Sequence, residues 1–182
     1  GAGTGWYLAR VLDGLPDGLG LALDVSKPAL RRAARAHPRV AAVGCDAWGS
    51  LPLRDGVAGT VLNVFAPRNG PEIARVLRPG GAALVVTPGP GHLAELVEPL
   101  GLLRVDDRKQ ERLTDALEPH LRVVERRVVE WPLRLGHTAV RDLAAMGPSA
   151  FHVDAAAVAE RVAALPEPVD VTASVAISRA LR

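Results

Sequence analysis

Short apolar runs alternate with amphipathic stretches along the first half of the chain. Apolar runs bounded by glycine, proline or acidic residues predict buried strands, and apolar residues repeating every three or four positions predict helices. Ser26 is the predicted N-cap of the second helix, and Arg78-Pro79-Gly80-Gly81 is a predicted turn. Because strands alternate with helices, we predict a layered α/β domain. Strands are predicted over residues 20–24, 40–43, 57–65 and 82–87, and helices over 6–12, 26–37, 71–77 and 91–100.

The second half of the chain has a different pattern. A helix is predicted over residues 111–117, a β-rich stretch over 121–135, and two helices over 138–146 and 154–165. Residues 169–177 alternate in period two over part of their length, which predicts a strand half-exposed on one face. Two late strands after a series of strand–helix units predict a mostly parallel sheet with an antiparallel strand at or near its edge.

The chain begins inside a glycine loop, Gly1-Ala2-Gly3-Thr4-Gly5. Such a loop needs a strand in front of it, because ligands bind beyond the carboxyl ends of parallel strands. We therefore expect earlier residues that supply a first strand. The predicted fold is a mostly parallel seven-stranded sheet flanked by helices, with its first strand missing, in one N-terminally incomplete domain over residues 1–182.

Composition excludes several classes of protein. The chain is 48% hydrophobic and 23% charged, which is ordinary for a globular protein with a core. No apolar stretch approaches the roughly 18 residues that span a bilayer, and no signal peptide opens the chain, so we expect a cytoplasmic protein. Cys45 is the one cysteine, which excludes an internal disulfide and a multi-cysteine zinc site within this chain. We interpret it as a small buried apolar residue.

The basic residues are almost all arginine. Apart from Lys27 and Lys109, the 22 basic residues are arginines, yet the formal net charge is only +2. Arginine binds phosphates bidentately and stacks on bases, which suits an RNA partner. A GC-rich coding sequence would give the same composition, so charge alone does not decide between the two interpretations.

The glycine loop is the first candidate for a cofactor site. Glycines let the backbone turn tightly and approach a ligand closely, with N–H groups at a helix start facing it. The dinucleotide pattern G-x-G-x-x-G would need glycine at position 6, where the chain has Trp6. The spacing therefore favours the form found in methyltransferases over the form that binds nicotinamide cofactors.

Two acids follow the next two predicted strands. Asp24 could accept hydrogen bonds from both ribose hydroxyls of an adenosine-containing cofactor, as acids do in nucleotide-binding folds. It could instead be an acid that opens the following helix. Asp46, in the loop Cys45-Asp46-Ala47, could accept a hydrogen bond from the adenine amino group, or be an ordinary loop acid.

Two further loops are candidates for contact with a substrate. In Asn63-Val64-Phe65-Ala66-Pro67, which ends a predicted strand, Phe65 could stack on a base or belong to the core. The loop from Thr87 to Leu96 contains Pro88 and His92. His92 could act as an acid or base, contact RNA, or be an exposed histidine at a helix start with no catalytic role.

Several segments together resemble the ribosomal RNA large-subunit guanine-N1 methyltransferases, and in particular their tylosin-resistance branch. The resemblance covers nearly the whole chain, and the segments at 87–96 and 146–150 are its most diagnostic part. The matching segments are Asp24-Val25-Ser26-Lys27, Asn63-Val64-Phe65-Ala66-Pro67, residues 74–81, residues 87–96, and Met146-Gly147-Pro148-Ser149-Ala150.

The resemblance implies S-adenosylmethionine as cofactor and methylation of N1 of a hairpin-loop guanine in 23S rRNA, with macrolide resistance as a consequence. It also implies an N-terminal module with four zinc ligands, which this chain lacks; no metal site is expected in the chain itself, and a homodimer is the oligomer we consider. The expected cofactor-binding residues are Gly1, Ala2, Gly3, Gly5, Asp24, Val25, Asp46, Ala47 and Asn63, and the expected substrate-binding residues are Phe65, Pro67, Pro88, His92 and Met146.

Two other functions fit the same pattern. A small-molecule methyltransferase shares the fold and the glycine loop, but its activity would ignore ribosomal RNA. A non-catalytic RNA-binding or resistance scaffold would bind the cofactor without turnover. Guanine N1 carries a proton that must leave during methyl transfer, so a general base is useful. His92 is the weak candidate for that base.

Overall fold

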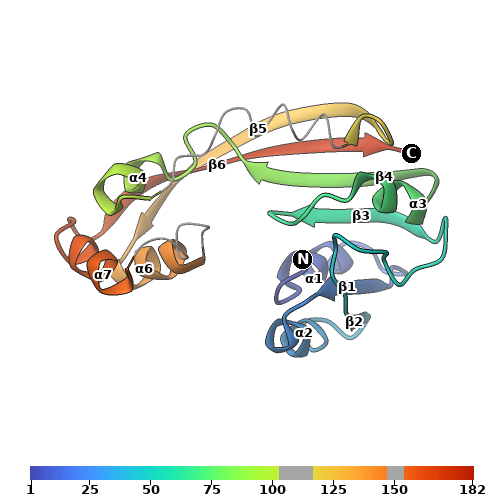
Figure 1. Ribbon diagram of the computed structural model, residues 1–182, viewed down its shortest axis with the longest axis horizontal. Coiled ribbons are helices and arrows are strands. Elements are labelled where there is room, and N and C mark those ends of the chain that lie inside the picture. The colour runs from blue at the N-terminus through green and yellow to red at the C-terminus, as the bar shows by residue number, and fades with distance from the viewer. Residues whose placement is uncertain (103–116, 147–153) are drawn as a thin grey trace. The chain divides into compact units, whose positions relative to one another are not determined.

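The computed structural model describes residues 1–102, 117–146 and 154–182 (Figure 1). These residues form two compact units. The first unit contains residues 1–87, 117–127 and 177–182, and the second contains residues 88–102, 128–146 and 154–176. The predicted helix over 111–117 lies, except for Leu117, outside the described residues. The prediction of a single domain over the whole chain stays a prediction.

Most of the predicted elements are present, with small shifts at their ends. The helix predicted to reach His37 ends at Ala33, and the one predicted from Gly91 begins at Ala94. The elements are α1 (Trp6–Asp13), β1 (Gly20–Asp24), α2 (Lys27–Ala33), β2 (Val40–Gly44), β3 (Ala58–Val64), α3 (Gly70–Val76), β4 (Leu77–Pro88), α4 (Ala94–Leu100), β5 (Arg122–Leu135), α6 (His137–Met146), α7 (Ala155–Ala163) and β6 (Val169–Leu181).

Side-chain caps explain where several helices begin. Oγ of Ser26 accepts a hydrogen bond from the N–H of Ala29, which confirms Ser26 as the N-cap of α2. Asn69 caps α3 and Asp154 caps α7 in the same way, through the N–H groups of Glu72 and Ala157. These side chains pair N–H groups that the first turn of a helix leaves without partners.

The six strands of the described residues form two sheets. β1 pairs in parallel with β2, and the second sheet has the order β3-β4-β6-β5 (Figure 1). β3 and β4 are parallel, with Asn63 opposite Val85. The order places β1 and β3 in different sheets, and the seventh strand expected before the glycine loop stays a prediction.

Two predictions about strands were wrong. The segment Arg78–Gly81, predicted as a turn, belongs to β4. Leu77 pairs with Ala58 and Ala82 with Thr60, so the extra residues form an irregularity in the ladder rather than a turn. The predicted half-exposed strand is β6, but its middle, from Ala173 to Ala176, is buried on successive residues and therefore on both faces.

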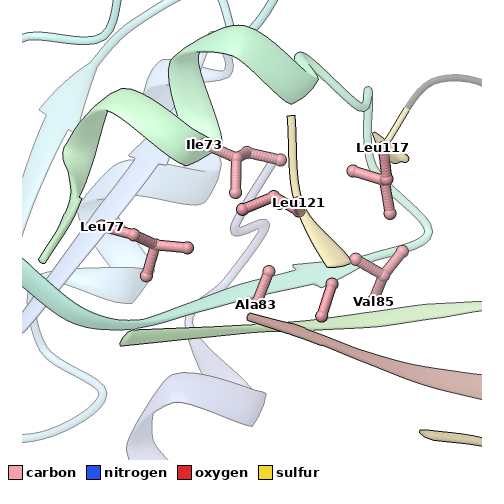
Figure 2. Packing of buried hydrophobic residues seen from close by; sticks show 7 residues of the cluster. Ile73, Leu77, Ala83, Val85, Leu117 and Leu121 are labelled. Carbon is pink, nitrogen blue, oxygen red and sulfur yellow. The ribbon is translucent and has the colours of Figure 1, made fainter. Parts of the chain in front are cut away.

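Each unit has its own hydrophobic cluster. In the first unit, Ile73 and Leu77 at the α3–β4 junction pack with side chains of β4, of β6 and of the residues before β5 (Figure 2). In the second unit, side chains of α4, α6 and α7 pack on the first part of β6. The first cluster contains Ile73, Leu77, Ala83, Val85, Leu117, Leu121 and Ala180, and the second contains Leu96, Leu100, Val140, Ala144, Val162, Val169 and Val171.

Candidate functional site

The glycine loop and Asp24 are joined by direct hydrogen bonds. Oδ2 of Asp24 accepts from the N–H of Gly3 at 2.7 Å, and Oδ1 accepts from the N–H of Ser26 at 2.8 Å. Gly3 has a φ of 56°, and an added Cβ there would meet no atom within 4 Å. The loop is therefore held against the end of β1 while the space in front of Gly3 stays open.

Gly5 has a different role in the same loop. It is the N-cap of α1 with a φ of 79°, in the left-handed region that favours glycine. An added Cβ would lie 3.0 Å from both Cα and Cβ of Ala33 in α2. Gly5 thus allows α1 to start close to α2, whereas Gly3 leaves room for a ligand.

The carboxyl group of Asp24 is held in its ionised form. Burial acts to raise its pKa, but the N–H groups of Ser26, Gly3 and Val25 and the positive charge of the N-terminus together outweigh this effect, and the net pKa lies below the usual value. A carboxylate oxygen can accept more than one hydrogen bond. Asp24 is therefore a preoriented, half-buried anion that can accept two hydroxyl donors from a ligand.

The start of the chain connects the ends of β1 and β3. The N–H of Ala2 donates to the carbonyl of Leu23 at 2.8 Å. An added Cβ on Gly1 would lie 2.8 Å from Cβ of Ala66, in the loop after β3. The predicted cofactor residues Gly1 and Ala2 therefore lie between the loops that follow β1 and β3.

The loop after β2 is bonded to the end of β1 and has a hydrogen bond within itself. The N–H of Cys45 donates to the carbonyl of Asp24 at 3.0 Å, and Oδ1 of Asp46 accepts from the N–H of Trp48 at 3.0 Å. Asp46 is exposed and Ala47 half-buried. Cys45 is half-buried rather than fully buried, and its thiol donates to the carbonyl of Asp46.

Asn63 shapes the loop after β3. Its side chain is 8% exposed, and its Nδ2 donates to the carbonyl of Pro67 at 2.6 Å. Its Oδ1 has no hydrogen-bond partner within the described chain. Phe65 has a φ of 50°, and its N–H donates to the carbonyl of Val86. Its side chain is 50% exposed, so it does not belong to the core.

Three of the predicted substrate-binding residues, Pro88, His92 and Met146, lie in the second unit. The segment from the end of β4 to the start of α4 is bonded to β6: the N–H of Gly89 donates to the carbonyl of Ser174, and that of Leu93 to the carbonyl of Thr172. Glu95 accepts from both the N–H and the hydroxyl of Thr172, at 3.1 and 2.7 Å. The segment at 87–96 is thus bound to β6 by several hydrogen bonds, and we call this segment the strap.

His92 adds a further hydrogen bond between the strap and β6. Its Nδ1 accepts from the N–H of Ser174 at 3.1 Å, and burial lowers its pKa. In the neutral ring that accepts at Nδ1, the proton is on Nε2. A catalytic role for His92 stays a prediction. Met146 ends α6 and is 81% exposed, while the rest of its motif, residues 147–150, lies outside the described residues.

One supporting network was not predicted from the sequence. Glu72 of α3 accepts from Nε and Nη2 of Arg75, both at 2.7 Å, and from the N–H of Leu51 at 2.6 Å. These donors lower the pKa of Glu72 to about 2. Arg75 also donates to Leu53 and Asp55, so the pair fixes the loop between β2 and β3. The i, i+3 spacing of acid and base was the available signal.

Three further findings concern the described residues as a whole. Within residues 1–102, 117–146 and 154–182, no group of three or more histidine, cysteine or acidic residues could hold a metal ion. No described helix is both long and apolar enough to cross a membrane. A shallow hollow of about 500 Å³ near the start of β5, lined by residues 118–123 with Leu181 and Arg182, contains none of the predicted site residues.

The fold is that of the class I S-adenosylmethionine-dependent methyltransferases, as predicted. A structure described as a candidate methyltransferase from Bacillus halodurans has a TM-score of 0.63 and 16% identity, covering 98% of this chain and 88% of that one. An S-adenosylmethionine-dependent methyltransferase from Thermotoga maritima has a TM-score of 0.56 and 16% identity, covering 100% of this chain and 78% of that one.

Close homologues of the chain are named 23S rRNA guanine-N1 methyltransferases, which confirms the resemblance seen in the motifs. The 23S rRNA (guanine(748)-N(1))-methyltransferase of Streptomyces fradiae is 57% identical over 175 residues, or 96% of this chain and 62% of that protein. A candidate enzyme of the same kind from Micromonospora griseorubida is 58% identical over 179 residues, or 98% and 61%. The chain thus spans about three-fifths of these relatives. No family model matches it.

Proposed function

We propose that the chain is the catalytic part of an rRNA methyltransferase that transfers a methyl group from S-adenosylmethionine to N1 of a hairpin-loop guanine in 23S rRNA. The observation that carries the proposal is the ionised Asp24, fixed by the N–H groups of Gly3 and Ser26 beside an open glycine loop. The names of the two homologues support the choice of RNA and of the guanine nitrogen.

The described residues fit an adenosine-containing cofactor. Asp24 would accept hydrogen bonds from the ribose hydroxyls, and the open face of Gly3 would admit the ligand without a side chain in the way. Asp46 and Ala47, attached through Cys45 to Asp24, would border the adenine. Val25 is 71% exposed next to Asp24 and would cover one face of the ligand.

When bound, S-adenosylmethionine supplies a methyl group on a positively charged sulfur. The protein's task is then to position the acceptor nitrogen in line with the methyl–sulfur bond and to exclude water. The guanine N1–H proton must leave as the carbon–nitrogen bond forms, and a general base would assist its departure. The loop Asn63–Pro67, fixed internally by the Asn63–Pro67 hydrogen bond, would border the acceptor base together with Phe65.

Further expectations belong to the same proposal. Pro88, His92 and Met146 would contact the RNA, and macrolide resistance would follow from the modified ribosome. The zinc module, the homodimer and the cytoplasmic location stay predictions. The small-molecule methyltransferase and the non-catalytic scaffold are the alternatives, and no contact within the described residues favours either.

The test uses unmodified 23S rRNA and labelled S-adenosylmethionine. Primer extension locates the product, because a methyl group on guanine N1 blocks base pairing and stops the polymerase. We expect a cofactor-dependent stop at one hairpin-loop guanine with the wild-type chain and a much weaker stop with Asp24→Asn. Cofactor binding without label in the RNA would contradict the proposal and favour one of the alternatives.

A further inference from the structure

The described aromatic side chains of the first unit are all exposed. Trp6 is 59% exposed, Tyr7 49%, Trp48 68% and Phe65 50%. Aromatic side chains usually contribute large buried areas to a core. We call these four residues the aromatic rim. Their exposure needs an explanation, because the same unit buries small and aliphatic side chains instead.

The aromatic rim follows the carboxyl ends of the strands. Trp6 and Tyr7 open α1 directly after the glycine loop, Trp48 lies in the loop after β2, and Phe65 immediately follows β3. Ligands of parallel sheets bind at this end of the strands. The four rings are therefore on the loops that also carry the predicted cofactor residues.

Hydrogen bonds and close packing fix these loops to one another. Nδ2 of Asn69 donates to the carbonyls of Trp48 and Gly49, each at 3.1 Å, and so joins the loop after β3 to the loop after β2. Gly1 packs against Ala66, which joins the glycine loop to the loop after β3. The aromatic rim is therefore carried by a connected scaffold rather than by independent loops.

Trp6 and Tyr7 form a defined pair with an arginine beside them. Their ring centroids are 5.0 Å apart with an interplanar angle of 89°, an edge-to-face arrangement. Cζ of Arg10 lies 5.8 Å from the centroid of the Trp6 ring, and its Nη1 is 3.2 Å from the carboxylate of Asp13. This geometry places a guanidinium beside an exposed ring face, a combination that stacks nucleobases.

Arg68 adds a positive charge three residues after Phe65. It is half-buried, and it makes no hydrogen bond or ion pair with any described residue. Burial lowers its pKa, because a charged group is less stable when it is withdrawn from water. A phosphate would satisfy this guanidinium through bidentate hydrogen bonds, whereas an apolar protein surface would leave it without an anion.

We propose that the aromatic rim receives the unpaired bases of an RNA loop, with bases stacked on Trp6 and Tyr7 and a backbone phosphate bound by Arg68. This inference rests on the proposed function and names the surface that would hold the substrate. Single-stranded loops are the RNA elements whose bases can leave their stack and lie on aromatic rings. Aromatic rings stack on any base. The aromatic rim therefore contributes affinity for the RNA loop and does not select which guanine is methylated.

The test compares three substitutions, Trp6→Ala, Arg68→Gln and the control Trp131→Ala. Trp131 is an exposed tryptophan of β5, in the second unit, and is 42% exposed. Affinity is measured by fluorescence anisotropy for a labelled 23S hairpin RNA and for a fully paired duplex of the same stem. S-adenosylmethionine affinity is measured by calorimetry on each variant, and circular dichroism checks that each variant folds.

We expect Trp6→Ala to weaken hairpin binding about 5- to 100-fold, in line with the loss of one stacked base, and to change duplex binding much less. Arg68→Gln should weaken binding to both RNAs and make it less dependent on salt, as expected for one lost phosphate contact. Trp131→Ala should leave both affinities within about twofold of wild type. If Trp6→Ala fails to fold, Trp6→Phe should keep hairpin binding, and Arg68→Gln tests the surface independently.

Other outcomes overturn the inference in separable ways. If wild type methylates 23S rRNA but Trp6→Ala and Arg68→Gln bind the hairpin as tightly as wild type, only the surface is wrong. If Trp6→Ala loses S-adenosylmethionine affinity instead, the ring belongs to the cofactor site. If it changes only self-association in sedimentation, the rim is a protein interface. If wild type neither binds nor methylates the RNA, the proposed function fails together with this inference.

Discussion

The backbone N–H of Ser174 in β6 donates a 3.1 Å hydrogen bond to Nδ1 of His92. Ser174 is fully buried, so this N–H has no access to water. The ring nitrogen of His92 thereby accepts a hydrogen bond of the kind that a backbone carbonyl of a neighbouring strand would accept. Glu95 likewise accepts hydrogen bonds from Thr172 of the same strand. These two contacts give a structural reason for a histidine and an acid three residues apart in the segment at 87–96.

Substituting His92 should therefore cost stability whether or not the residue is catalytic. His92→Ala leaves the buried N–H of Ser174 without an acceptor, which costs about 1–3 kcal/mol. His92→Asn keeps an acceptor oxygen near the position of Nδ1 and should cost less. Urea unfolding measures both variants. Equal stability of His92→Ala and wild type would contradict the structural role.

The same contact predicts a pH dependence. Burial lowers the pKa of His92 in the folded protein, so the unfolded chain binds the proton more tightly. The contribution of His92 to stability is fully present above about pH 6.5, the usual pKa of histidine, and is lost as the pH falls below it. The stability difference between wild type and His92→Ala should narrow between pH 7.5 and pH 5. A difference that stayed constant would show that the ring is not titrating in this contact.

Asp24→Asn should weaken S-adenosylmethionine binding. The asparagine amide has one acceptor oxygen and no charge. It therefore cannot accept hydrogen bonds from the N–H groups of Gly3 and Ser26 and also from both ribose hydroxyls. A hydrogen bond to a charged group contributes about 1.5–3 kcal/mol, which corresponds to a loss of about 10- to 150-fold. Calorimetry measures the affinity. Asp17→Asn, an exposed acid in the turn after α1, is the matched control and should bind as wild type does.

Gly89→Ala should destabilise the second unit. An added Cβ would overlap Oγ of Ser174 and lie 3.1 Å from its carbonyl carbon, so either the strap or β6 must shift. Overpacking of this kind costs about 1–3 kcal/mol. Gly14→Ala is a suitable comparison, because its nearest contact would be 3.6 Å away. Thermal unfolding should separate the two variants, and an unchanged midpoint for Gly89→Ala would refute the predicted clash.

Glu72→Gln should loosen the loop between β2 and β3. Neutral glutamine keeps one acceptor for Leu51 but loses the ion pair with Arg75. Because the folded pKa of Glu72 is lowered to about 2, its contribution is present above the usual pKa of glutamate and is lost as the pH falls toward 2. The melting temperature should drop by a few degrees at pH 7 and by less at pH 4. Hydrogen exchange at residues 50–55 should rise in the variant, and protection equal to wild type would argue against the network.

Sequence patterns predicted most elements of the first unit because its strands are short and bounded by clear signals. The limits of β1 were predicted without error, since a glycine and an acid enclose an apolar run. The prediction for residues 78–81 was wrong. Pro-Gly-Gly indicates a turn, and no residue near it in the sequence shows that Leu77 pairs with Ala58 at the start of β3. No sequence pattern indicated that Arg68 would be half-buried, because the burial of an arginine depends on residues distant in the sequence.

The sequence by itself determined the order of strands and helices, the glycine loop and the acid that follows it, because apolar spacing and backbone freedom act locally. It also carried the motifs whose resemblance to guanine-N1 methyltransferases the names of the homologues confirm. Only the tertiary structure decided that Asp24 is bound by Gly3, that β6 lies inside its sheet, and that His92 pairs with Ser174. These relationships join residues far apart in the chain, and no local pattern specifies which distant partner will be brought into contact.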